Sequence, residues 1–199
     1  MHIEETKYEP INTEDTVSTI NAAYKEGMLP GIEMVLIRYT GNQKHILLDS
    51  YEQIGKDAFK NNLTLESIVM SNGLISIGFG AFSGCTSLTG VIIPDSVTSI
   101  DILAFQGCSG LTNVVIPSSV TSIGEVSFSG CTGLTSVTIP GSVTSIGDDA
   151  FVDCEGLTEI VIPDSVTSIG SGIIASCIGL KSLQIPGFIS LPNLKKCFF

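Results

Sequence analysis

Five evenly spaced cysteines are the residues of this sequence most suggestive of chemistry. They stand 23 residues apart, at Cys85, Cys108, Cys131, Cys154 and Cys177, and a sixth, Cys197, lies outside the series. Thiols at a regular spacing can bind a metal, form disulfides or pack as small apolar side chains. Which of these applies depends on how the 23-residue step places the thiols in space.

Stacked coils would set the five sulfurs in a row, about 4.8 Å apart. A tetrahedral zinc site needs four ligands around one point, and no histidine accompanies these thiols. Neighbouring Cα atoms would lie within disulfide range, but parallel Cβ vectors are poorly aimed for a bridge. Five thiols cannot all pair, and Asn62 takes the cysteine position one step earlier. Free, buried thiols are therefore favoured over disulfides or a metal, and they fit an oxidising or a reducing compartment.

The cysteines belong to a repeat. With Pro140–Ile162 as the reference, the pattern is Pro-x-Ser-Val-Thr-Ser-Ile-Gly-x-x-Ala-Phe-x-x-Cys-x-x-Leu-Thr-x-Val-x-Ile, and it recurs about six times. A unit this short cannot bury an apolar face alone, so the units must stack, and the terminal units diverge as caps. We predict an N-terminal cap over 1–47, a solenoid over 48–185 and a C-terminal cap or tail over 186–199.

Each unit predicts two extended segments. The alternation ending in Ile160 and Ile162 is typical of a strand, which the following proline ends. Val143 and Ile146 form an apolar pair in the return segment, so a second, shorter sheet is expected. Phenylalanines at the same step, at Phe59, Phe82, Phe105, Phe128 and Phe151, should form one buried stack.

The segment between these strands predicts a turn. Ala-Phe-x-x-Cys is typical of a short helical turn. The glycine after each Ser-Ile suggests a residue with positive φ, and Asp101 takes that place once. The glycines concerned are Gly55, Gly78, Gly124, Gly147 and Gly170.

The repeat resembles a known family. Leu-Thr-x-Val-x-Ile-Pro-x-Ser-Val-Thr-Ser-Ile-Gly-x-x-Ala-Phe-x-x-Cys is similar to the BspA-like leucine-rich repeats over about 48–185, although Ile173 and Ile174 replace Ala and Phe in the last unit. The resemblance implies a β-rich solenoid, a right-handed coil of about six turns with a parallel sheet, and the residues before it are expected to add an α/β N-terminal cap. Family members are mostly surface or secreted proteins of bacteria and some protists, which implies adhesion or binding.

Residues 1–47 do not fit the repeat. A helix capped near Asn12 and running to about Glu26 is predicted, followed by a hairpin made of 32–39 and 45–48. A cap is the simplest interpretation, and a separate binding module is the alternative. The start, MHIEETKYEP, has neither the basic nor the apolar part of a signal peptide, so the chain as written is expected to be soluble and unexported. A chain that begins after a removed signal would look the same, and the family resemblance implies a surface or secreted protein.

The charge argues against nucleic acid as a partner. The net charge is −11, and none of the nine Lys and Arg lies between Asn61 and Leu180, a span with ten Asp and Glu. Nucleic-acid binding needs Lys and Arg to displace counterions from phosphates. The sequence has no run of about 18 apolar residues either, so we expect no membrane insertion.

Catalysis finds little support. The two histidines, His2 and His45, lie outside the full repeats, and the acidic pairs Asp148-Asp149 and Asp153-Glu155 fall in surface turns. Solvated charge is the usual role of such pairs, with a calcium site as the alternative. Repeated units place like residues in rows, whereas an enzyme needs unlike residues at one spot. We expect no enzyme, cofactor or metal.

Rows suit binding. The outward positions of the principal strands form one column of Val69, Ile92, Val115, Thr138, Val161 and Gln184, beside a second of Ser67, Gly90, Asn113, Ser136, Glu159 and Ser182. The candidate binding residues are Val69, Ile92, Asn113, Val115, Ser136, Thr138, Glu159 and Val161. Strand propensity alone explains branched residues on a sheet. A flat apolar strip would instead dock a protein or host-matrix ligand.

Hydroxyls form another pair of columns, in Ser96-x-Thr98, Ser119-x-Thr121, Ser142-x-Thr144 and Ser165-x-Thr167. Regular hydroxyl grids resemble the surfaces of ice-binding proteins, although hydrogen bonding between strands explains them equally well. The leading hypothesis is a non-catalytic protein-binding chain that uses its sheet face. The alternatives are a structural spacer that presents residues 1–47 and, third, ice binding.

Overall fold

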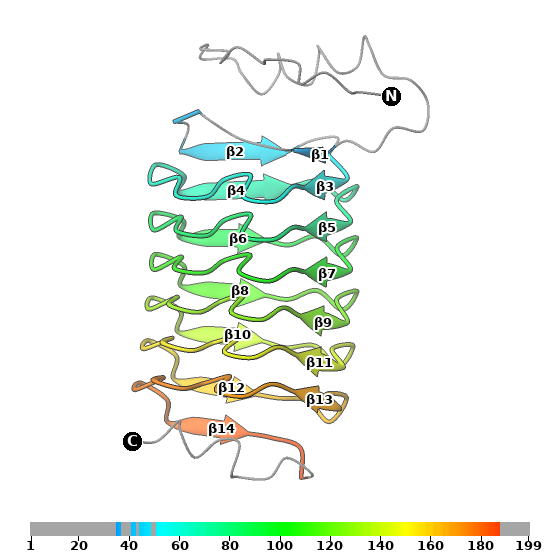
Figure 1. Cartoon of the computed structure of the whole chain (residues 1–199), viewed down its shortest axis with the longest axis vertical. Coiled ribbons are helices and arrows are strands. Elements are labelled where there is room, and N and C mark those ends of the chain that lie inside the picture. Colours follow the sequence, from blue (N-terminus) through cyan, green and yellow to red (C-terminus); the bar gives the residue numbers. More distant parts are fainter. Residues whose placement is uncertain (1–34, 37–40, 43, 49–50, 188–199) are drawn as a thin grey trace, which may run out of the picture. The chain divides into compact units, whose positions relative to one another are not determined.

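The chain winds as a parallel β-solenoid in this computed structural model, which describes residues 35–36, 41–42, 44–48 and 51–187 (Figure 1). The chain divides into two units, Met1–Ile32, which lies outside the described residues, and Glu33–Phe199. The described strands of this second unit form two seven-stranded parallel sheets. No helix forms in the described part of the chain, and none there could cross a membrane.

The long sheet contains the principal strands. They are β2 (His45–Leu48), β4 (Ser67–Met70), β6 (Gly90–Ile92), β8 (Asn113–Val115), β10 (Ser136–Thr138), β12 (Glu159–Val161) and β14 (Ser182–Gln184). Their residues alternate between core and solvent, so that Val114 is buried between the exposed Asn113 and Val115. From β4 to β14, neighbouring strands pair in the 23-residue register, with Ile92 opposite Val115. A slip of one residue would expose every inward side chain, which is why the alternation specifies the register.

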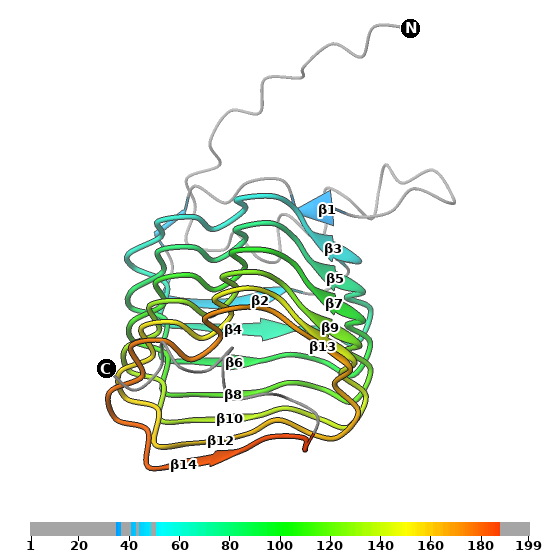
Figure 2. The same ribbon diagram turned by 60° about the horizontal axis from the view of Figure 1, so that its bottom comes forward.

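The short sheet consists of two-residue strands. They are β1 (Val35–Leu36), β3 (Gln53–Ile54), β5 (Ser76–Ile77), β7 (Ser99–Ile100), β9 (Ser122–Ile123), β11 (Ser145–Ile146) and β13 (Ser168–Ile169). The two sheets run along different sides of the coil (Figure 2). Val143 and Ile146 are buried, so the predicted second apolar pair and second sheet are confirmed.

The third side of each coil, which we call the turn wall, consists of 57–61, 80–84, 103–107, 126–130 and 149–153. The predicted helical turn is wrong here. The N–H groups of Leu103, Phe105 and Gly107 donate to carbonyls of the next coil at 2.7–3.0 Å. Positive φ values at Leu103 (61°) and Gly107 (68°) turn these groups away from a helical pattern. The wall is therefore a third ladder between coils.

The positions predicted to need positive φ were also wrong. Gly147 and its counterparts are not left-handed, and the left-handed glycines are Gly80, Gly84, Gly107, Gly130 and Gly172. A Cβ on Gly147 would lie 2.5 Å from the backbone nitrogen of Glu125 in the preceding coil. Close approach of two backbones, and not the dihedral angle, requires glycine there.

The core is a set of ladders running through the coils. Phe59, Phe82, Phe105, Phe128 and Phe151 are fully buried and stack with ring centroids 5.0–5.4 Å apart and planes within 6° of parallel. The predicted aromatic stack is confirmed. Ile173 and Ile174, the departures in the last unit, are buried as well, so two aliphatic side chains fill the space of Ala and Phe.

The predicted N-terminal hairpin is wrong. β1 pairs in parallel with β3, with Val35 opposite Gln53, and β2 pairs in parallel with β4, with His45 opposite Ser67. The two runs thus begin different sheets. Without them, β3 and β4 would be the open edges of the short and the long sheet. Because β1 and β2 pair with these edges, they continue the existing ladders. The predicted helix up to Glu26 and nearly all of the C-terminal cap lie outside the described residues.

Candidate functional site

The outward face of the long sheet carries an apolar strip made of Val69, Ile92, Val115 and Val161. Their exposed fractions are 48%, 71%, 64% and 39%. Val69 lies opposite Ile92, and Ile92 lies opposite Val115, on adjacent parallel strands. Adjacent strands are about 4.8 Å apart, so these side chains form one continuous apolar surface. Thr138, opposite Val115, continues the column and separates it from Val161.

A column of small polar residues runs beside the strip. Asn113, Ser136 and Glu159 are exposed and lie in register. Gly90 occupies the same column, and a Cβ built there would meet nothing within 4 Å. Gly90, beside Ile92, is therefore open to solvent and adds no side chain to this column. All eight residues predicted from the sequence lie on this one face.

Charge is distributed unevenly along the coils, which the sequence interpretation did not use. No charged residue occurs from Ser67 to Pro94, which includes the most exposed member of the strip. The reference unit, 140–162, carries five carboxylates, at Asp148, Asp149, Asp153, Glu155 and Glu159. Counting charges unit by unit, instead of over the whole span, would have shown this difference.

The cysteine series is internal, and free thiols are confirmed. Cys85, Cys108, Cys131, Cys154 and Cys177 are free and buried. Each thiol donates to the carbonyl oxygen of the phenylalanine in the preceding coil, as Cys131 does to Phe105 at 3.2 Å. Burial raises the pKa of the Cys85 thiol to about 11 and raises the pKa of Cys131 well above its ordinary value. A protonated, enclosed thiol is neither a nucleophile nor a metal ligand.

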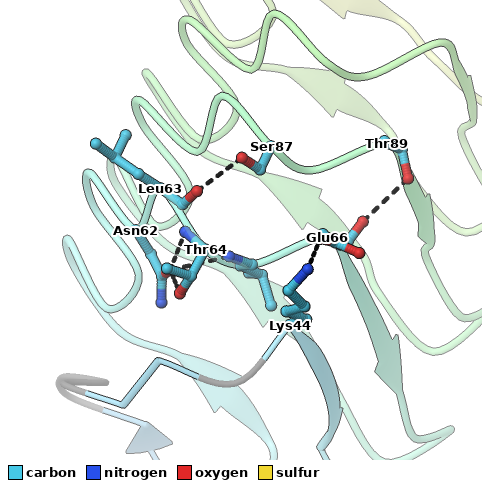
Figure 3. Close-up of polar contacts among 8 residues, drawn as sticks. Lys44, Asn62, Leu63, Thr64, Glu66, Ser87 and Thr89 are labelled. Carbon is cyan, nitrogen blue, oxygen red and sulfur yellow. Dashed lines mark hydrogen bonds and ion pairs between the residues drawn. The ribbon is translucent and has the colours of Figure 1, made fainter.

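Asn62 replaces the cysteine in the first unit. Its side-chain oxygen accepts hydrogen bonds from the backbone N–H groups of Thr64 at 3.1 Å and Leu65 at 3.0 Å, and from the Thr64 hydroxyl at 2.9 Å (Figure 3). Its oxygen therefore caps the turn before β4, and its amide nitrogen donates to the Gly41 carbonyl at 3.5 Å, whereas each cysteine only donates, to a phenylalanine carbonyl of the preceding coil. Sequence spacing could not distinguish these two roles.

The hydroxyl columns are used within the protein. Ser142 donates to the carbonyl of Val120 at 2.8 Å, and Thr144 donates to that of Thr121 at 3.2 Å, in each case in the preceding coil. A further threonine column does the same, beginning with Thr89, which donates to the Glu66 carbonyl at 3.1 Å (Figure 3). These bonds support the packing interpretation of the hydroxyls over an ice-binding one.

The acidic pairs do not form a metal centre in the described residues, where no group of three or more His, Cys, Asp or Glu is placed to hold an ion. One oxygen of Asp148 accepts hydrogen bonds from the backbone N–H of Ser171 at 2.6 Å and from its hydroxyl at 3.1 Å. Asp148 thus joins two coils. His45 is the first residue of β2, opposite Ser67.

Comparison with known proteins decides the family. Residues 52–181 match the BspA type leucine rich repeat region in six copies. The chain belongs to this family. Six copies agree with the number of turns predicted from the 23-residue spacing. The matching family is one of leucine-rich repeats, which are generally non-catalytic.

Solved leucine-rich repeat proteins of bacteria resemble the fold. A leucine-rich repeat protein of T. pallidum is 30% identical with a TM-score of 0.76, over 81% of this chain and 79% of that one. A leucine-rich cell surface protein of Faecalibacterium prausnitzii is 31% identical with a TM-score of 0.65, over 78% of this chain. This chain spans about half of that protein, 51% of its length. No curated protein matches the chain.

Proposed function

We propose that this protein is a non-catalytic adhesion protein that binds a protein or host-matrix partner through the outward face of the long sheet. The observation that carries the proposal is the strip, four aliphatic side chains exposed by 39–71% on one sheet face. An exposed apolar surface is costly in water unless a partner covers it. Strand propensity would explain branched residues, but it does not require a branched column on the exposed side.

Two further findings support the proposal. The F. prausnitzii protein that resembles this chain is described as a cell surface protein, which fits attachment to an external partner. Solenoids also use extended rows of outward residues as binding surfaces. A partner on the long sheet would contact several coils at once, so its affinity would depend on the whole column.

Three charges on the strip test the proposal. The full chain carrying Ile92→Lys, Val115→Lys and Val161→Lys is compared with the wild type for capture of purified extracellular-matrix proteins on a biosensor. Loss of central apolar contacts should weaken binding by at least about 30-fold. The matched control carries Thr98→Lys, Thr121→Lys and Thr144→Lys, which adds the same charge at exposed positions next to the short sheet.

The control should bind as the wild type does, and thermal unfolding should show both variants folded. Capture that survives the strip substitutions would contradict the proposal. It would favour a structural spacer that presents residues 1–47, and deletion of those residues would then abolish capture.

A further inference from the structure

The outward face of the long sheet differs between its two ends. Strands β4, β6 and β8 carry no charged residue, and Ile92 lies beside Gly90 in an apolar area, although the exposed Asp95 follows β6 as Asp164 follows β12. On β12 the position equivalent to Gly90 is Glu159, which is exposed. β6 and β12 are separated by β8 and β10, so Glu159 lies three strand spacings, about 14 Å, from Gly90.

Further carboxylates flank Glu159. Glu155 lies in the turn before β12 and Asp164 in the turn after it, and both are exposed. The nearest cation along the chain is Lys181, whose backbone N–H donates to the Thr158 carbonyl at 2.9 Å. In the described part of the chain, no ion pair joins Lys181 to any of these carboxylates. Among the described residues, Glu159 therefore has no ion-pair partner.

We propose that the partner of the long sheet is a cationic protein segment that binds in one direction. Its apolar side chains cover Val69, Ile92 and Val115, and a Lys or Arg further along meets Glu159. The inference rests on the proposed function, because it describes what the same face binds.

Charge complementarity carries this choice of partner. Residues 61–180 hold ten carboxylates and no Lys or Arg, and nine of these carboxylates lie from Asp95 to Asp164, so an acidic partner would meet like charge on the coils that follow β6. A second copy of the chain, with its net charge of −11, is disfavoured for the same reason. A cationic segment would be attracted from a distance and then aligned by Glu159 at one end of the strip.

Selection from a phage-displayed library of short random peptides on the immobilised full chain tests the inference. The peptides retained are those that bind the wild type but not the variant with Ile92→Lys, Val115→Lys and Val161→Lys. We expect them to be rich in Lys or Arg together with aliphatic or aromatic residues. If no strip-dependent peptide of any composition is recovered, the proposed function fails. Strip-dependent peptides that are neutral or acidic would overturn only the present inference.

A pair of single variants then tests the direction of binding with one selected peptide. Glu159→Gln should weaken binding about 2- to 5-fold and make it less sensitive to salt, as expected for one solvent-exposed ion pair. Glu125→Gln removes the same charge from an exposed residue in the turn before the turn wall. It should leave the affinity within measurement error. Equal losses in both variants would show that only overall charge matters and would overturn directed binding.

Discussion

The inward ladders and the outward columns of the solenoid share a 23-residue spacing but differ in how strictly their residue types repeat. The inward aromatic ladder is phenylalanine at five successive positions, whereas the outward column contains valine, isoleucine, threonine and glutamine. Inside, each side chain must fill the space left by identical neighbours above and below it. Outside, solvent accepts many side chains, so the outward residues can differ from coil to coil and can distinguish partners.

Alkaline pH should give the largest expected effect, a fall in the unfolding free energy that comes from the inward thiols and not from the outward columns. Burial raises the pKa of Cys85 from 9.0 to about 11 and raises the pKa values of Cys108, Cys131 and Cys154. Below about pH 9 the thiols are protonated in both states, and stability should not depend on them. Above it the unfolded chain releases protons that the folded chain keeps. Between about pH 9 and pH 11 the unfolding free energy should then fall by up to about 1.4 kcal/mol per pH unit for each thiol, measured by denaturant titration, and the contribution of Cys85 should level off near pH 11.

The same thiols should resist labelling. At neutral pH a thiol reagent should modify the five internal cysteines only after the protein is unfolded. Rapid labelling of two or more of them in the native protein would show that the inward ladder is open to solvent. A mass deficit from disulfides would contradict the assignment in a different way.

Truncating one ring of the aromatic stack should cause the next largest loss of unfolding free energy. Phe128→Ala removes the ring between Phe105 and Phe151 and should lower the unfolding free energy by about 3–5 kcal/mol. Val115→Ala, on the outward face, should change it by less than about 0.5 kcal/mol. Chemical denaturation of the two variants measures both values. Comparable losses would show that the outward column is also part of the packing.

Two glycines allow an inward and an outward backbone position to be compared in the same way. Gly147→Ala places a methyl group against the backbone of Glu125 and should cost about 1–3 kcal/mol. Gly141→Ala, in the same coil, meets nothing within 4 Å and serves as the matched control. Thermal unfolding should separate the two, and an unchanged melting temperature for both would contradict the close approach of the coils.

The smallest expected effect is a stabilisation. Ser127 is fully buried, and in the described structure its hydroxyl has no hydrogen-bond partner, while Ala81, Ala104 and Ala150 fill the same position in other coils. Ser127→Ala should therefore raise the unfolding free energy by about 1 kcal/mol. Ser142→Ala, which loses the hydrogen bond to Val120, should lower it by a similar amount. If both variants shifted the melting temperature in the same direction, this assignment would be contradicted.

The repeat could be predicted from the sequence because its signals are local and repeated. Alternation in each unit identifies Val114 as inward and Val115 as outward, and the 23-residue step then aligns every coil. Once the coils stack, the cysteines and phenylalanines must form ladders. The composition of the outward face follows from the same register, so the candidate site could be located before its shape was known.

Other features depended on contacts between coils. Leu103 and Val126 adopt positive φ, which their residue types disfavour, because their N–H groups then donate to the next coil. The run at 32–39 resembled half of a hairpin with 45–48, yet its strand, β1, pairs with β3 of the short sheet. The sequence by itself determined the period, the inward and outward faces and the free thiols. The tertiary structure alone decided the turn wall, the pairing of β1 and β2 and the close approach at Gly147, because each depends on backbone groups of a neighbouring coil.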